Sequence, residues 1–239
     1  MAGRLGRVSR AKEVAGRAAA EQVRDGMVVG LGTGSTVHFT LERLAERIRS
    51  ERLAVQGVPT SLETEKKARA LWIPLLTLEG VESIDLTIDG ADEIDGRFDM
   101  IKGGGGALLR EKVVASLSKR ECIVVDRSKV VGRLGVRFPL PVEVVPFARA
   151  AVVRRIVVLG GRPTVRQRGD EVVITDNGNE VLDCAFAGGI DDARALERAL
   201  DEIPGVVESG LFIGLAHVLV IGYEDGRVES RERTSSHEG

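Results

Sequence analysis

Two glycine-rich loops with a run of carboxylates between them hold the residues of this sequence that are best suited to chemistry. The first loop spans residues 30–36, and the second begins at Lys102, which four glycines follow. Because such loops lack side chains, their backbone N–H groups can approach an anion closely, and a helix N-terminus behind the loop adds positive potential. The loops therefore predict a binding site for a phosphate group.

The carboxylates lie in the segment Asp-Gly-Ala-Asp-Glu-Ile-Asp, residues 89–95. They would repel a phosphate, so we expect them to contact sugar hydroxyls or to move protons. Asp89 and Asp92 come where an apolar strand, residues 84–88, ends, and ligands bind at the carboxyl ends of strands in open α/β sheets. A solvated acidic turn or a helix N-terminus is the simpler alternative. Together with the loops, the carboxylates indicate an enzyme that acts on a small, phosphorylated, hydroxyl-rich metabolite.

The first loop differs from the two common nucleotide-binding patterns. A dinucleotide fingerprint counted from Gly30 would need glycine where Ser35 stands, and no Gly-Lys-Ser/Thr sequence follows as in a P-loop. Thr33, Ser35 and Thr36 instead offer three hydroxyls at the start of a helix. An ordinary helix N-cap uses the same residue types. The density of glycines and the strand before the loop favour phosphate binding.

Lys102 follows the alternating segment 98–101 and therefore also lies at the end of a predicted strand. Four consecutive glycines are costly in chain entropy, and a strong helix, residues 107–117, begins directly after them. Glu111 lies about one turn into this helix. Its position alone does not distinguish a catalytic carboxylate from an exposed one that pairs with a nearby Lys or Arg.

No pattern typical of a metal or redox site is present. The histidines, His38, His217 and His237, are scattered without ligand spacing. Cys122 and Cys184 are too few and too far apart to suggest a disulfide framework. We expect no metal ion and no cofactor.

The composition is that of an ordinary globular protein. The chain has 239 residues, of which 43% are hydrophobic and 29% charged, and its net charge of −2 gives no bulk attraction to nucleic acid or to acidic membranes. One Trp and one Tyr are too few for base-stacking platforms. No apolar stretch approaches the roughly 20 residues of a membrane span, and residues 1–5 lack the apolar core of a secretory signal. We expect a cytoplasmic protein with neither a nucleic-acid nor a membrane partner.

The elements that must position these groups alternate between strands and helices in the first half of the chain. Strands alternating with helices imply a mainly parallel sheet with helices on both faces, a Rossmann-like α/β arrangement. The strands are predicted at residues 27–31, 53–58, 73–76, 84–88 and 122–125. The helices are predicted at residues 11–23, 37–48, 61–71 and 107–117.

The alternation of strands and helices changes near the segment Phe-Pro-Leu-Pro, residues 138–141. Beyond it we predict the β-α-β-β-α-β order of a ferredoxin-like, split βαβ unit. Its elements are a strand at 142–145, a helix at 147–159, two strands flanking 176–179, a helix at 191–203 and a strand at 206–212.

A last apolar run, residues 217–222, should return to the first sheet, and the polar tail after Tyr223 should be frayed. We therefore predict two domains. Residues 1–135 with 213–239 form the α/β domain, and residues 136–212 form an inserted, smaller α+β domain.

Several motifs, taken in order along nearly the whole chain, resemble the A-type ribose-5-phosphate isomerases. The first are Gly-Thr-Gly-Ser-Thr at 32–36, Asp-Gly-Ala-Asp-Glu at 89–93, Lys-Gly-Gly-Gly at 102–105 and Arg-Glu-Lys at 110–112. The segments 138–144, 175–179 and 203–207 are similar to that family as well. Each motif alone is weak, but jointly they are highly specific.

The resemblance implies a metal-free aldose–ketose isomerase of the non-oxidative pentose phosphate pathway, which interconverts ribose 5-phosphate and ribulose 5-phosphate through an enediolate. Glu111 would be the base that moves the proton. Asp89 and Asp92 would contact sugar hydroxyls and assist ring opening, and Lys102 would lie near the developing oxyanion. The family is generally dimeric or tetrameric, so we expect a homodimer or a homotetramer.

The resemblance also implies where the substrate binds. The Thr33–Thr36 loop would hold chiefly the phosphate, and Lys12 and Lys129 should face the site. Substrate contacts are thus expected at Lys12, Thr33, Gly34, Ser35, Thr36, Asp89, Gly90, Ala91, Asp92, Lys102, Gly103, Gly104, Gly105 and Lys129.

Two other functions compete with this interpretation. A CoA-transferase-like enzyme would use a Glu nucleophile, but it needs room for a long nucleotide cofactor that the short loops do not leave. A non-catalytic sugar-phosphate sensor would usually carry a DNA-binding segment, and no helix-turn-helix pattern with a basic recognition helix is evident.

Overall fold

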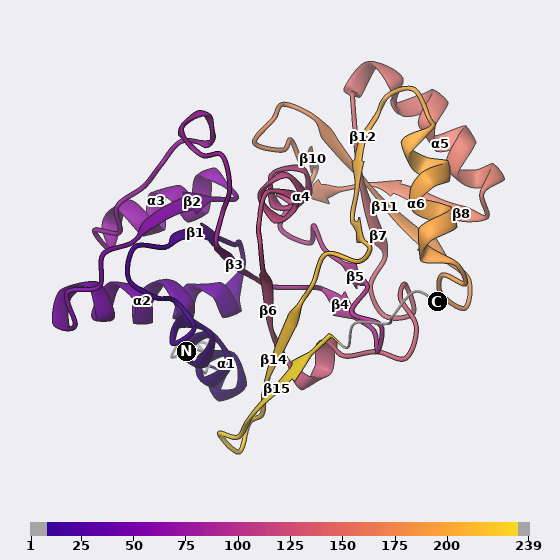
Figure 1. The fold of residues 1–239 in the computed structure, drawn as a ribbon. Coiled ribbons are helices and arrows are strands. Elements are labelled where there is room, and N and C mark those ends of the chain that lie inside the picture. The colour runs from indigo at the N-terminus through magenta and orange to yellow at the C-terminus, as the bar shows by residue number, and fades with distance from the viewer. Residues whose placement is uncertain (1–8, 234–239) are drawn as a thin grey trace, which may run out of the picture.

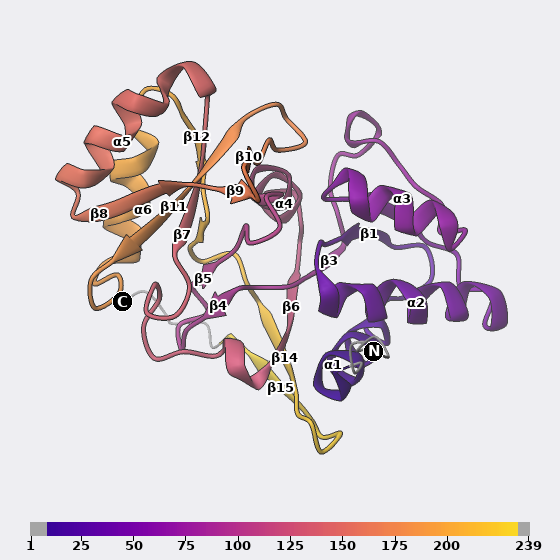
Figure 2. The ribbon, with the colours of Figure 1, turned by 180° about the vertical axis from the view of Figure 1, so that it is seen from behind.

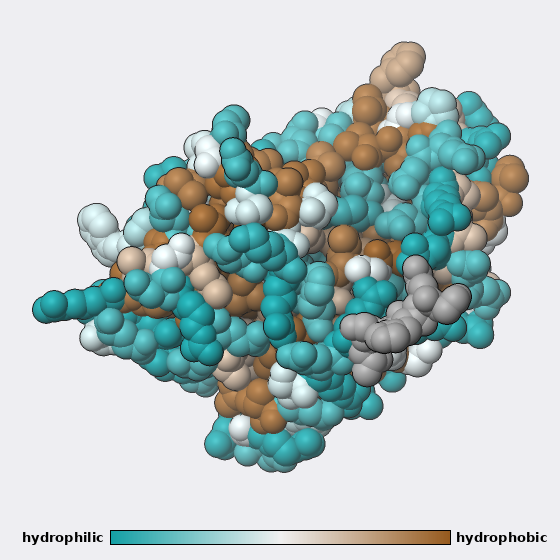
Figure 3. Space-filling model, in the orientation of Figure 1, coloured by the Kyte–Doolittle hydropathy of each residue, from teal (hydrophilic) through white to brown (hydrophobic). Residues whose placement is uncertain are grey.

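The computed structural model describes residues 9–233 of the chain. Residues 1–5 and His237, which entered the sequence interpretation, lie outside this range. Two units lie side by side, and the strands β6, β14 and β15 run between them (Figures 1 and 2). Figure 3 shows that hydrophilic residues cover much of the surface seen in this orientation, with patches of hydrophobic residues between them.

The main sheet has six strands, and all except β15 run parallel to their neighbours. In spatial order they are β15 (Val228–Glu232), β14 (Val218–Gly222), β6 (Glu121–Asp126), β3 (Leu86–Asp89), β1 (Val28–Leu31) and β2 (Gln56–Pro59). The apolar run predicted to return to this sheet does so as β14. This confirms the predicted α/β fold class, with a mainly parallel sheet.

Four α-helices flank the main sheet: α1 (Arg10–Ala20), α2 (Ser35–Ser50), α3 (Leu62–Ala70) and α4 (Leu108–Ser116). The apolar stripe of α1 and α2 packs on the sheet face that carries Cys122 and Val124. Val114 of α4 packs on the opposite face. Ala68 of α3 belongs to the same core as the stripe of α2, and α3 lies beside β2 (Figures 1 and 2). Covering both faces is what allows a parallel sheet to consist of apolar strands.

The second unit has a four-stranded antiparallel sheet with two helices. Its strands, in spatial order, are β12 (Val206–Ser209), β7 (Leu140–Val144), β11 (Glu180–Phe186) and β8 (Gly161–Val165), and its helices are α5 (Arg149–Val158) and α6 (Ala193–Asp201). The predicted β-α-β-β-α-β order is therefore present. Apolar side chains of both helices and of the sheet form a separate core.

The remaining elements are short. A three-stranded sheet holds β13 (Leu211–Phe212), β5 (Met100–Ile101) and β4 (Glu93–Ile94). A small hairpin pairs β9 (Gln167–Arg168) with β10 (Glu171–Val172). The 3₁₀ turns are η1 (Leu78–Gly80), η2 (Arg127–Lys129) and η3 (Pro146–Ala148).

The single strand predicted at 206–212 is in fact two strands in different sheets. Gly210 divides them: its N–H donates to Pro141 at 2.7 Å, and its carbonyl accepts from the Lys102 N–H at 2.9 Å. A Cβ on Gly210 would lie 2.4 Å from the Lys102 carbonyl oxygen, so only glycine allows this approach. Before Gly210 the chain pairs with β7 as β12. After Gly210 it pairs, as β13, with β5, the strand that directly precedes Lys102.

Of the two strands predicted to flank 176–179, the second is present as β11, whereas Ile174 before the turn makes only an isolated bridge to Glu180. β11 pairs with β7 and β8, and residues 166–179 between β8 and β11 form the β9–β10 hairpin and a tight turn. The reason is Glu143, which is buried on β7 and accepts hydrogen bonds from Thr175, Asn177 and Asn179. The polar turn thus satisfies a buried carboxylate as well as reversing the chain.

Two further predictions about single segments are wrong. Residues 73–76 form only an isolated bridge through Leu75 to Gly57, because Pro74 has no N–H to donate to a ladder. The tail after Tyr223, expected to be frayed, contains β15, which pairs along its length with β14. This edge strand is polar because it has only one neighbour and lies at the surface.

Candidate active site

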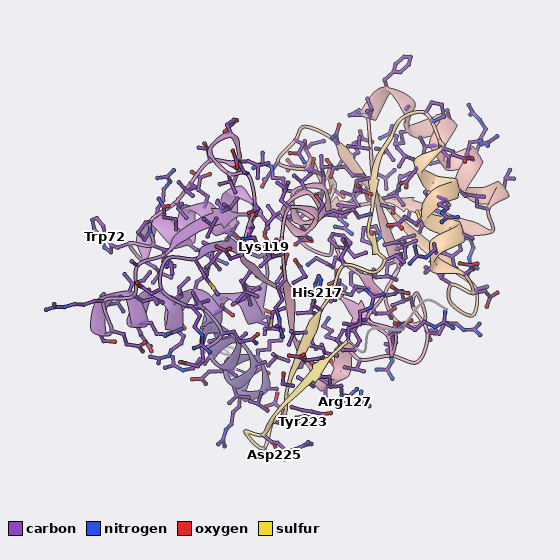
Figure 4. The ribbon with its side chains drawn as sticks, viewed as in Figure 1. Trp72, Lys119, Arg127, His217, Tyr223 and Asp225 are labelled. Atoms are coloured by element: carbon purple, nitrogen blue, oxygen red, sulfur yellow. The ribbon has the colours of Figure 1, made fainter. Side chains whose placement is uncertain are left out.

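The predicted site residues meet at the carboxyl ends of β1, β3 and β6. Figure 4 shows the direction of these strands: Lys119 and His217 lie at one end of β6 and β14, and Arg127 and Tyr223 lie at the other. A pocket opens near the second end. It is lined by Lys12, Thr33, Gly34, Ser35, Thr36, Gly90, Ala91, Asp92, Lys102, Gly103, Gly104, Gly105, Glu111, Val124, Val125 and Lys129.

Nearly all the predicted contacts therefore share one pocket. Asp89 is the exception: it is 0% exposed and lies behind the lining residues. Val124 and Val125 line the pocket without having been predicted. The sequence showed them only as part of an apolar strand, a pattern that does not reveal which residue reaches the strand end.

The first loop presents a helix N-terminus whose cap position lacks a side chain. Gly34, with φ of 124°, is the N-cap of α2 and provides no side-chain hydrogen bond to it. The first N–H groups of a helix have no partner within the helix, and they attract anions. Lys12 of α1 reaches this end, and its Nζ lies 3.0 Å from Oγ of Ser35. Positive charge and unpaired donors therefore converge on one spot.

Thr33 holds the loop in place through a cluster of hydroxyls. Its Oγ1 lies 2.8 Å from the hydroxyls of both Thr60 and Ser61, and Thr64 in turn donates to the carbonyl of Gly32. The Thr33 hydroxyl is thus occupied within the protein. No sequence signal linked residues 60–64 to the site, because the contact is made only when β2 lies beside β1.

Asp89 and Lys102 form a buried ion pair at the centre of the site. Oδ2 of Asp89 lies 3.1 Å from Nζ of Lys102, and Oδ1 accepts from the N–H groups of Thr33 and Gly90. Nζ of Lys102 also donates to the carbonyl of Gly90. A Cβ on Gly32 would lie 2.2 Å from Oδ1 of Asp89, so glycine is required there.

Glu111 completes this cluster from α4. Its Oε2 lies 3.4 Å from Nζ of Lys102, and its side chain is about as buried as that of Lys102. It is not an exposed helix residue, which was the alternative that the sequence left open. The neighbouring Asp92 accepts from the Gly104 N–H at 2.7 Å.

Burial and mutual charge shift the ionisation of these groups. Burial raises the pKa of Glu111 to about 8 against the opposing effect of Lys102, and the charges of Asp89 and Asp92 add to the rise. Burial of Lys102 lowers its pKa, but Asp89, Glu111 and Glu121 outweigh that effect and raise the pKa overall. Glu111 is thus a carboxylate of unusually high proton affinity held beside a permanent cation, an arrangement suited to moving a proton from carbon.

In the described part of the chain, no cluster of three or more His, Cys, Asp or Glu side chains could hold a metal ion. No helix within residues 9–233 is long and apolar enough to cross a membrane.

Comparisons with known proteins agree with one another. A family model for ribose 5-phosphate isomerase A (phosphoriboisomerase A) matches residues 56–226. The ribose-5-phosphate isomerase A of Thermosynechococcus vestitus is 49% identical over 229 residues, which cover 94% of this chain and 97% of that protein. The solved ribose 5-phosphate isomerase from Plasmodium falciparum has a TM-score of 0.90 and 40% identity, covering 95% of this chain and 99% of that one. A solved D-ribose-5-phosphate isomerase in complex with phospho-erythronic acid has a TM-score of 0.89 and 36% identity, covering 93% of this chain and 97% of that one.

A further buried carboxyl, that of Glu121, lies near this cluster. Glu121 opens β6 opposite Thr87, two residues before Asp89 on the neighbouring strand, and is 1% exposed. Neither of its side-chain oxygens has a hydrogen-bond partner among the described residues. Burial raises its pKa well above the ordinary value, Asp89 and Glu111 raise it too, and Lys102 opposes them. The sequence placed this residue only at the edge of an apolar run.

Glu121 should make the stability of the protein fall as pH rises. Its pKa is higher in the folded than in the unfolded chain, so its stabilising effect is complete below the unfolded pKa of about 4.3 and is lost as pH rises toward the folded pKa. Within that window the loss is at most about 1.4 kcal/mol per pH unit. Glu121→Gln cannot titrate, so its advantage over the wild type should grow with pH.

The measurement is urea unfolding of both proteins at several pH values between about 5 and 8. Glu82→Gln, which changes an exposed carboxylate shortly before β3, is the matched control and should run parallel to the wild type. If the free energy of unfolding of Glu121→Gln also differed from that of the wild type by the same amount at every pH, the prediction would be contradicted.

Proposed function

This chain belongs to the ribose 5-phosphate isomerase A family and is an aldose–ketose isomerase, and we propose that Glu111 is its proton-transferring base. The reaction interconverts ribose 5-phosphate and ribulose 5-phosphate. The observation that carries the proposal is the buried cluster in which Lys102 lies 3.1 Å from Asp89 and 3.4 Å from Glu111. The cluster borders a pocket that also contains an uncapped helix N-terminus.

Glu111 would remove the proton from C2 of the open-chain aldose and return it to C1. Over these two proton transfers, which pass through an enediolate, O1 gains a proton and O2 loses one, so that the carbonyl moves from C1 to C2. A positioned carboxylate of this kind contributes on the order of 10²–10⁴-fold. The raised pKa of Glu111, about 8, supports the role because it makes the carboxylate a stronger base than an exposed one.

Lys102 would stabilise the negative oxygen of the enediolate. Its ammonium is 2% exposed and has a raised pKa, so it stays charged throughout the reaction. A preorganised donor aimed at a developing oxyanion is worth about 10²–10³-fold. The neighbouring Phe212 ring, whose centroid lies 5.4 Å from Nζ, further surrounds this cation.

The two aspartates would have different roles. Asp92 lines the pocket and is suited to contact sugar hydroxyls and to assist ring opening. Asp89 is 0% exposed; its Oδ1 accepts from two backbone N–H groups, and its Oδ2 faces Lys102 as an ion pair. We therefore assign Asp89 mainly to holding Lys102 and the first loop, a narrower role than the resemblance implied.

The phosphate would bind where α2 begins. Gly34, Ser35 and Thr36 offer backbone donors, and Lys12 and Lys129 offer charge from two sides. Gly90, Ala91 and Gly103–Gly105 would form the walls along the sugar. The relative solved with phospho-erythronic acid supports a phosphorylated ligand for this pocket.

The two competing functions are not favoured. Both the family match and the relatives point to ribose 5-phosphate isomerases. A sensor would not need a buried, high-pKa carboxylate beside a cation.

The domain division, the location and the assembly also remain proposals. We propose that residues 1–135 with 213–239 and residues 136–212 form two domains, which the separate cores support. We propose a cytoplasmic location, with which two free, buried cysteines are compatible. We propose a homodimer or homotetramer, which exposed apolar side chains such as Trp72 and Phe147 support; light scattering of the purified protein would decide this.

Glu111→Gln should separate catalysis from stability. The amide keeps the size of the side chain but cannot accept a proton from carbon, so kcat should fall about 10²-fold or more. The fold should persist, because the change removes a buried charge without opening a cavity. Assays of kcat and of the urea midpoint check both parts, with Glu82→Gln as a control that should change neither. A Glu111→Gln enzyme of normal kcat would return the base role to an aspartate.

The pH profile should report the same group. Because Glu111 must be ionised to act as base, kcat/KM should rise with pH through an apparent pKa well above the ordinary value of about 4.3 and toward about 8. Asp92→Asn removes a charge that raises this pKa, so it should move the acid limb to lower pH. An acid limb at the ordinary carboxyl pKa would contradict the assignment.

Phosphate anchoring predicts that free ribose is a very poor substrate, since binding of the phosphate helps to position the reacting carbons. Lys12→Met should lower kcat/KM for ribose 5-phosphate about tenfold, the worth of one charged hydrogen bond, and leave the rate with ribose unchanged. Lys119→Met, at the opposite end of β6 (Figure 4), is the matched control and should affect neither substrate. Equal losses with both substrates would place the phosphate elsewhere.

A further inference from the structure

Arg166, which follows β8 in the second unit, donates hydrogen bonds to the glycine loop of the active site. Its Nη1 donates to the carbonyl of Gly103 at 2.7 Å and to that of Gly104 at 3.2 Å. Its Nε and Nη2 donate to the two carboxylate oxygens of Asp183 on β11, at 3.0 and 2.5 Å. The side chain is 13% exposed. One guanidinium therefore joins the second sheet to the loop behind Lys102.

The loop that Arg166 holds has little to stiffen it from within. Glycines have more conformational freedom to lose on folding than any other residue, and Gly103 has a φ of 99°. Within the loop, the Gly106 N–H bonds back to the Gly103 carbonyl at 2.9 Å. The Gly103 carbonyl thus accepts two donors, one of them the arginine, and its orientation depends on both.

The orientation of these peptides matters for the site because the next N–H faces a proposed substrate-binding carboxylate. The Gly104 N–H donates to Oδ2 of Asp92 at 2.7 Å. A Cβ on Gly104 would lie 2.5 Å from Oδ1 of Asp92, so loop and carboxylate are closely packed. A peptide group is planar, so turning the Gly103 carbonyl turns the Gly104 N–H with it.

We propose that Arg166 is a positioning residue for the isomerase reaction, one that orients the Gly103 and Gly104 peptides so that Asp92 and the pocket wall beside Lys102 meet the substrate correctly. Arg166 does not line the pocket, so it acts through the loop and not on the substrate. The inference rests on the proposed function of this pocket. It makes the second unit part of the catalytic apparatus.

The geometry requires an arginine at this position. The planar guanidinium binds a carboxylate with two donors while a further N–H faces the two carbonyls. Asp183 balances its charge, so its effect on the loop is directional and not a general positive field. A lysine has a single nitrogen and cannot keep this whole set of bonds at once.

The test compares Arg166→Met and Arg166→Ala with the wild type. Misplacing reacting groups by about 1 Å costs up to about 10²-fold, so kcat should fall about 10- to 100-fold. The inhibition constant of inorganic phosphate should stay within about twofold, because the groups proposed to bind it, the start of α2 with Lys12 and Lys129, are not part of this loop. Added guanidinium at millimolar concentration should restore part of the kcat of Arg166→Ala and none of that of Glu111→Gln.

Arg162→Met is the matched control, since Arg162 is exposed on β8 of the same unit, and its kcat should stay at the wild-type value. A folded Arg166→Met enzyme with normal kcat and a lower unfolding midpoint would overturn the proposal, because the arginine would then only join the two units. A loss of kcat in Arg166→Ala that added guanidinium does not relieve would also overturn the proposal.

If removal of the side chain prevents folding, Arg166→Lys and Asp183→Asn carry the test. Reduced kcat at an unchanged phosphate inhibition constant would support positioning, and normal kcat would overturn it. A wrong assignment of the base would show separately, as normal kcat in Glu111→Gln, whatever Arg166 does.

Discussion

The burial of the Lys102 ammonium between two carboxylates is the constraint on which the rest of the structure depends. Removing an ion from water costs several kcal/mol in a protein, and attraction to a partner repays this only when the geometry is good and the remaining donors are satisfied. Here Asp89, Glu111 and the Gly90 carbonyl surround the ammonium. An unpaired Lys102 would be strongly destabilising at the same place. The loops that approach this point must therefore be held tightly.

Glycines make that approach possible. Side chains at Gly32 and Gly104 would overlap the carboxylates of Asp89 and Asp92. The first loop meets Asp89 through the Thr33 N–H, and the second meets Asp92 through the Gly104 N–H. The same backbone that could bind a phosphate thus also holds the carboxylates of the site. Glycine is costly for stability, and here that cost is accepted where function requires close contact.

The second unit stabilises the loop that carries Lys102 through hydrogen bonds. Gly210 accepts from the backbone N–H of Lys102, and Arg166 holds the carbonyls that follow it. The turn around Asn177 folds onto buried Glu143 and also accepts a hydrogen bond from Arg110, next to Glu111 in sequence. Residues distant in the chain therefore determine where the helix with the proposed base lies. The second unit thus holds the loop that carries Lys102 in place.

The sequence alone was sufficient to predict the alternation of strands and helices, the β-α-β-β-α-β order of the second unit and the return of residues 217–222 to the first sheet. Glycine-rich turns and motifs also pointed to residues that line the pocket, and the family resemblance added Lys12 and Lys129. These follow from local periodicity, from glycine-rich turns at strand ends and from motifs at fixed spacing, all of which are readable along the chain. The errors lie where long-range bonds override local preference, as when Gly210 divides one apolar run between two sheets.

Only the tertiary structure decided how the charges are arranged. A periodic helix pattern cannot tell whether Glu111 faces water or Lys102, because that depends on where α4 packs against the sheet. The buried Glu121 and the grip of Arg166 on the glycine loop had no sequence signal for the same reason. Residue types and spacing determine which groups are available for chemistry, whereas the desolvation and mutual distances that set their pKa values arise only when separate segments of the chain are brought together.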